Sequence, residues 1–97
     1  MLCNIESLCR KDVINVCNGA RIGYVRDVNI DTQNACITEL LVESDAALSF
    51  KKKNRCLVIP WSCIQVIGSE TILVRCENDP QPFEPQKPKK LSNLFTR

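Results

Sequence analysis

Cysteine is the residue type in this chain with the widest chemical scope, because a thiolate can attack a substrate, bind a metal or form a disulfide. Seven cysteines occur among 97 residues, at positions 3, 9, 17, 36, 56, 63 and 76. They are at least six residues apart, whereas structural zinc sites use pairs about two to four residues apart. The odd count also argues against a disulfide framework. We therefore expect most cysteines to be small apolar residues of the core or its boundary, with no metal and no cofactor.

The other catalytic arrangements lack their partners. Histidine is absent, which excludes Ser–His and Cys–His mechanisms and histidine-containing metal sites. Asp27 has no second carboxylate at a useful spacing, so we expect it to bond to nearby backbone groups. Gly19 and Gly23 flank the start of a predicted strand, whereas a phosphate-binding glycine loop needs a following helix. The sequence predicts no catalytic residue, and we do not expect an enzyme.

A run of cations is the clearest candidate for contact with a partner. Lys51, Lys52, Lys53 and Arg55 place four positive charges in five positions. Such a run is usually a solvated loop, but it can also contact an acidic protein surface or nucleic-acid phosphates. The net charge is only +2, from 13 Lys and Arg against 11 Asp and Glu. Binding to nucleic acid is therefore open but not favoured.

Apolar residues outside the predicted core extend this partner surface. Trp61, the only tryptophan, could anchor a protein partner or pack on the domain behind Pro60, and we favour packing. Leu94 and Phe95 follow a proline-rich spacer and could dock on the domain, on a second copy or on a partner, or fray as chain ends do. The sequence thus leaves open both an unidentified protein partner and a homo-oligomer.

Six short strands must position these residues. The candidates are 13–17, 21–30, 36–43, 56–59, 64–67 and 71–75. Turn residues such as Gly19 and Gly68 separate them, Pro60 ends one of them, and one helical turn is expected at 4–8. In strand 21–30, Val25 has the opposite parity to Ile22, Val28 and Ile30, so we expect a bulge near Asp27 that shifts the register and lets all four point inward. Short strands without helical periodicity predict an all-β fold, a small antiparallel barrel that is closed or nearly closed.

The composition divides the chain into two parts. Residues 1–76 form the predicted barrel domain, and residues 77–97 form a lysine-containing tail with four of the five prolines. Proline at this density favours extended backbone. No segment approaches 18 consecutive apolar residues, so we expect no transmembrane segment. The first residues do not resemble a secretory signal, and we expect a cytoplasmic protein.

Residues 19–28 read Gly-Ala-Arg-Ile-Gly-Tyr-Val-Arg-Asp-Val, and residues 58–68 contain Ile-Pro-Trp. Together these two segments resemble the PRC-barrel family. The resemblance covers about residues 1–76 and is strongest to the small stand-alone sporulation-protein branch found in spore-forming Firmicutes. It implies a small β-barrel used as an interaction module, with no known chemistry. Its motif residues are given structural roles: Gly19, Gly23, Asp27, Pro60 and Gly68.

Three hypotheses of function follow. The first is a non-enzymatic protein–protein interaction or adaptor module, with a role in sporulation implied by the resemblance. The second is an RNA- or ribosome-associated assembly factor, implied by the likeness to the C-terminal barrel of the ribosome maturation factor RimM. The remote third is a cysteine-based redox or metal protein, for which Cys56 beside the basic run offers an electropositive setting for a thiol.

Overall fold

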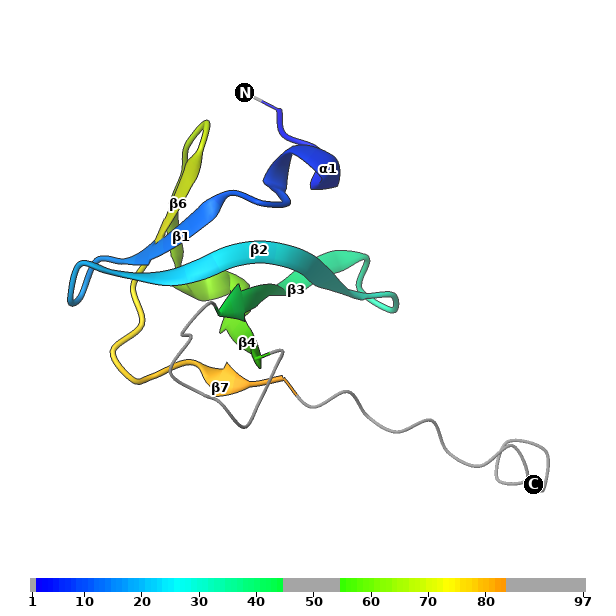
Figure 1. Cartoon of the computed structure of the whole chain (residues 1–97). Helices are drawn as coiled ribbons and strands as arrows, with labels where there is room; N and C mark the ends of the chain where they lie inside the picture. Colours follow the sequence, from blue (N-terminus) through cyan, green and yellow to red (C-terminus); the bar gives the residue numbers. More distant parts are fainter. Residues whose placement is uncertain (1, 45–54, 84–97) are drawn as a thin grey trace, which may run out of the picture.

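A computed structural model describes residues 2–44 and 55–83 of the chain (Figure 1). Helix α1 (Ile5–Leu8) is the single helical turn expected near the N-terminus, and Asn4 caps it by accepting a bond from the Ser7 N–H. The remaining elements are β1 (Asp12–Asn15), β2 (Ala20–Asp31), β3 (Cys36–Ser44), β4 (Arg55–Pro60), the 3-10 helix η1 (Trp61–Cys63), β5 (Ile64–Ile67), β6 (Thr71–Val74) and β7 (Gln81–Pro82). No helix in these ranges has the length and apolarity needed to cross a membrane.

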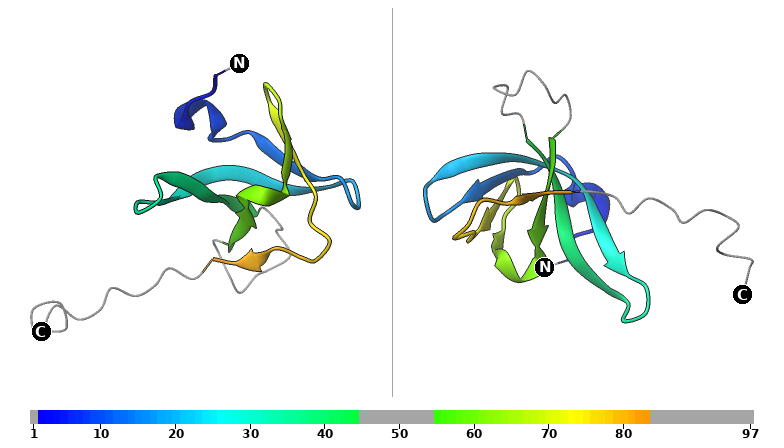
Figure 2. Two further views of the ribbon diagram at one scale, coloured as in Figure 1. Left: turned by 180° about the vertical axis from the view of Figure 1, so that it is seen from behind. Right: turned by 90° about the horizontal axis from the view of Figure 1, so that it is seen from below.

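The predicted all-β fold is confirmed, and the seven strands form one sheet in the order β5-β6-β1-β2-β3-β4-β7. The strands curl around a shared interior (Figure 2), but hydrogen bonds do not close the sheet, and β5 and β7 are its two edges. One pairing corrects the antiparallel expectation, because β1 and β6 run parallel. A parallel pair needs a long connection, and here the curled strands β2 to β5 supply it.

The core lies on the inner face of this curl. Opposing residues of neighbouring strands share a face, so that Val28, Leu40 and Ile59 form one buried row across three strands. Ile72 and Val13 form a second row, and both have no exposed surface. These rows bring β-branched and leucine side chains from both halves of the chain into one apolar cluster. These same apolar residues are the basis on which the strands are predicted from the sequence.

The bulge expected near Asp27 is confirmed. The register of β2 against β3 shifts between Val25 and Asp27, and this shift lets Val25 and Val28 both reach the core. The Val28 N–H donates to Asp27 Oδ1 at 2.8 Å, which is the kind of local backbone bond expected for Asp27. The inward position expected for Ile30 is wrong, because a second register shift precedes it and it is 52% exposed.

Two glycines of the motif meet different demands. Gly19 has a φ of +73° in the turn between β1 and β2, a conformation that glycine adopts without a steric penalty. Gly23 lies inside β2, where a Cβ atom would collide with the backbone of Glu43 in β3. The close approach of two backbones therefore requires glycine at position 23, whereas position 19 has open space around it.

We predict that Gly23→Ala lowers the free energy of unfolding by about 3 kcal/mol, because a backbone clash cannot be relieved by a side-chain rotation. Gly19→Ala is the matched control and should cost about 1–2 kcal/mol, the strain of a left-handed alanine. Urea unfolding followed by tryptophan fluorescence measures both. Equal losses in the two variants would contradict the proposed close approach.

Candidate interaction site

A buried asparagine fixes the segment that builds the site. Asn15, the last residue of β1, is 5% exposed. Its Oδ1 accepts the N–H groups of Cys17 and Cys76, both at 3.1 Å, and its Nδ2 donates to the Cys76 carbonyl at 2.9 Å. The side chain thus holds the backbone just after β6 against the end of β1. A buried amide is stable only when it is bonded in this way.

From Cys76 the chain crosses to the opposite edge of the sheet and forms β7. Gln81 pairs with Val58 of β4, and the Phe83 N–H donates to the Cys56 carbonyl at 2.7 Å. This crossing encloses a cavity of about 320 Å³, which we call the β7 groove. Val58, Pro60, Cys63, Cys76 and residues 77–81 line it.

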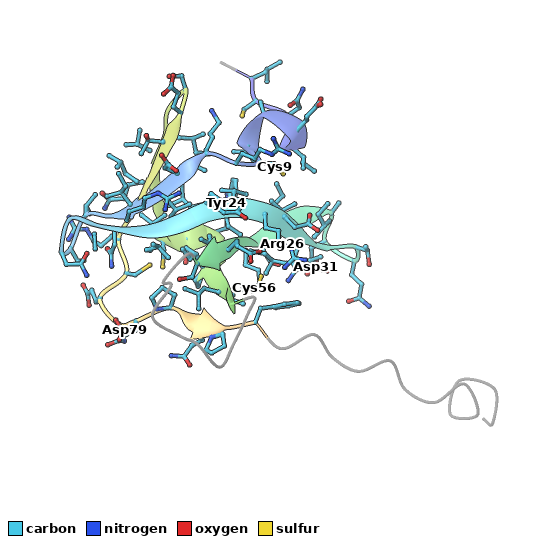
Figure 3. The ribbon with its side chains drawn as sticks, viewed as in Figure 1. Cys9, Tyr24, Arg26, Asp31, Cys56 and Asp79 are labelled. Atoms are coloured by element: carbon cyan, nitrogen blue, oxygen red, sulfur yellow. The ribbon has the colours of Figure 1, made fainter. Side chains whose placement is uncertain are left out.

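The β7 groove combines apolar walls with an acidic rim. Val58, Pro60 and Pro80 contribute apolar surface, while Glu77 and Asp79 are exposed. Asp79 lies on the connection that leads into β7 (Figure 3). None of the lining residues is Lys or Arg, so the groove is suited to an apolar side chain with cations beside it. Its volume is near the lower end of the range for ligand pockets, about 300–1,000 Å³.

The structure describes only some of the predicted partner residues. Lys51, Lys52, Lys53, Leu94 and Phe95 lie outside the described residues. The backbone of Arg55 begins β4 opposite Ser44.

Trp61 is half-buried and packs against the hydrophobic core, as favoured from the sequence. It is not one of the residues that line the groove. Pro60 joins β4 to η1, and Gly68 forms a turn in which its N–H donates to the Thr71 carbonyl at 2.7 Å.

The sequence did not indicate Glu77 and Asp79 as site residues. They belong to the segment assigned to the tail, and an exposed acid just before a proline-rich stretch carries no local signal of a groove. β7 lies in the same segment, while the division at residue 76 stays a prediction. The groove exists only because residues 76–83 return to β4, which is a long-range arrangement.

Most of the cysteines lie at the boundary of the core, as expected: Cys9, Cys56, Cys63 and Cys76 are half-buried, while Cys3, Cys17 and Cys36 are exposed. In the described part of the chain, no three His, Cys, Asp or Glu side chains form a group that could hold a metal ion.

Burial raises the pKa of the Cys76 thiol to about 11, and the neighbouring Cys63 adds to the rise by its charge and a hydrogen bond. Burial also raises the pKa of Cys56, although the Arg26 guanidinium acts in the opposite direction. The redox hypothesis expects an activated, low-pKa thiol at Cys56, and the pKa of this thiol is shifted in the other direction.

These features define a class of protein: a small all-β domain with barrel-like curvature and a groove at the edge of its sheet. A family model described as PRC-barrel domain matches residues 4–76. The chain belongs to the PRC-barrel family.

Relatives agree with this assignment. The chain is 39% identical over 66 residues to a protein of Bacillus subtilis (strain 168) named probable sporulation protein YlmC, covering 67% of this chain and 82% of that one. It is 26% identical over 80 residues to the uncharacterized protein YmxH of the same organism, covering 80% and 94%. An uncharacterized protein of Clostridium acetobutylicum is 27% identical over 75 residues, covering 77% and 86%. None of these names describes an enzyme.

We predict that Asn15→Ala lowers the free energy of unfolding by about 2 kcal/mol, because it leaves backbone groups at Cys17 and Cys76 without their partner. In this variant, amides of residues 76–83 should also exchange with deuterium faster than in the wild-type chain, while exchange in β2 and β3 should change little. Asn29→Ala is the control, since it removes an asparagine bonded to Glu39 in the opposite part of the sheet. Unchanged exchange in residues 76–83 would contradict the anchoring role.

We predict that Cys76 is alkylated slowly at pH 8, because a pKa of about 11 keeps its reactive thiolate roughly a hundredfold rarer than that of an ordinary cysteine. Its rate should keep rising up to about pH 11. Iodoacetamide labelling followed by peptide mass spectrometry gives the rate for each cysteine, with exposed Cys3 as the reference. In urea the difference should disappear. Equal rates for Cys76 and Cys3 in the folded protein would overturn this prediction.

Proposed function

We propose that this chain is a non-enzymatic adaptor that binds a protein partner through the β7 groove. The observation that carries the proposal is the groove itself, in which an apolar floor and two exposed carboxylates adjoin the edge of the sheet. Recognition of a peptide by a sheet edge combines backbone pairing with pockets for side chains. The expected partner is a protein with a basic and apolar segment.

The biological setting is proposed from the relatives. The printed name of the Bacillus subtilis relative is a probable sporulation protein, and we propose that this chain also acts in sporulation. The cytoplasmic location expected from the sequence stays a prediction. The acidic rim disfavours RNA at the groove, because nucleic-acid phosphates would face Glu77 and Asp79.

We predict that tagged full-length chain recovers a defined protein from an extract of its source, both with and without nuclease. Glu77→Lys with Asp79→Lys reverses the charge of the rim and should reduce recovery about tenfold, the factor that 1.4 kcal/mol represents. Glu6→Lys with Glu70→Lys makes the same change of charge outside the groove and should leave recovery unchanged.

Two results would reject the adaptor proposal. Recovery of ribosomal proteins or RNA that disappears after nuclease treatment would support the RNA-associated alternative. Equal recovery by the groove variant and the control would show that the partner binds elsewhere.

A further inference from the structure

The charges of this chain are unevenly divided along its length. Residues 2–44 and 55–83 hold six Lys or Arg and nine Asp or Glu, a formal charge of −3. Residues 45–54 and 84–97 hold seven Lys or Arg and two Asp or Glu, a formal charge of +5. The modest net charge therefore combines an acidic folded sheet with two basic segments, and long-range attraction between such parts is expected.

The carboxylates of the β7 groove are available to this attraction. Glu77 and Asp79 are exposed, and neither forms an ion pair with a cation of residues 2–44 or 56–83. The ion pairs seen there, Arg21 with Asp12 and Arg26 with Glu43, lie on other strands. Within the described part of the chain, the groove thus offers two acids without an ion-pair partner beside apolar walls.

Residues 84–97 have the complementary chemistry. They hold four cations and one acid, together with the apolar residues Leu91, Leu94 and Phe95. An apolar side chain of this segment can occupy the floor at Val58, while its lysines meet the acidic rim. We propose that the β7 groove binds residues 84–97 of a second copy of this chain.

The direction of β7 favours a second copy over the chain's own segment. Gln81 lies opposite Val58 and Pro82 opposite Leu57, and Phe83 bonds to Cys56. The chain therefore travels along β4 away from Pro60, and the groove lies behind it. Two copies related by a two-fold axis can exchange their segments reciprocally, which gives a closed dimer with two equal contacts.

The inference rests on the proposed use of the groove for protein contact, but it has its own test. The test is a charge swap between the β7 groove and residues 84–97, made in the full-length chain. The first variant carries Glu77→Lys and Asp79→Lys, and the second carries Lys87→Glu, Lys89→Glu and Lys90→Glu. Each alone places like charges in groove and segment and should raise the dimer dissociation constant at least about tenfold. Mixed together, they restore both contacts and should form a heterodimer.

Light scattering during size-exclusion chromatography measures the mass of each sample. The wild-type chain is expected to be a dimer at about 0.05 M salt and to dissociate toward 0.5 M, since screening weakens exposed charge pairs. Glu6→Gln with Glu70→Gln removes two acids outside the groove and should leave the dimer intact. A wild-type monomer at every concentration, or a mixture of the variants that stays monomeric, would overturn the inference.

Isotope mixing identifies which copy supplies the segment. Unlabelled and ¹⁵N-labelled full-length chains are mixed and coupled with a carbodiimide, which joins a carboxylate to a contacting lysine. We expect links from Glu77 or Asp79 to Lys87, Lys89 or Lys90, with heavy–light pairs at the statistical proportion. Links within single copies only, or links to acids outside the groove, would overturn the inference.

The two proposals fail in different ways. A monomeric chain that still recovers its partner through the groove would overturn the dimer and leave the adaptor function standing. If the chain forms a dimer and the charge-swap variants pair, but the chain recovers no partner, the adaptor function is overturned and the dimer stands.

Discussion

The hydrogen bonds of one buried side-chain amide, that of Asn15, organise this domain more than any other contact. Asn15 is the only buried polar residue in the described ranges, and its three hydrogen bonds join the end of β1 to the residue that follows β6. The Val16 N–H adds a bond to the Val74 carbonyl at 2.8 Å. Together they secure the parallel β1–β6 pair and fix the starting point of residues 76–83. The groove therefore depends on a side chain that does not line it.

Curvature is the second constraint. Register shifts occur between Val25 and Asp27 in β2 and between Ile64 and Val66 in β5. Bulges bend strands and increase their twist, so that rows from β3 and from β6 reach one apolar cluster. Gly23 permits the close approach of β2 to β3 that this bend requires. The sheet keeps two edges, and one of them is the two-residue strand β7, where proline is tolerated.

Local signals predicted most of the fold. Alternating β-branched residues located the six main strands, Gly19 and Pro60 marked a turn and a strand end, and the parity of Val25 against Val28 indicated the bulge. The parallel pair and the groove escaped prediction because they depend on Asn15 meeting Cys76, 61 residues away. The exposure of Ile30 was not predicted, because the residue types around it do not indicate the second register shift. Among the candidate site residues, Pro60 lines the groove, while Trp61 serves the core.

Charge is distributed differently in the sheet and in residues 45–54 and 84–97. The surface ion pairs Arg21–Asp12 and Arg26–Glu43 belong to a kind that stabilises by about 0–1 kcal/mol. Basic residues are concentrated in residues 45–54 and 84–97, which produces a molecule with acidic and basic parts. Such a molecule can associate with complementary surfaces while its scaffold stays unchanged.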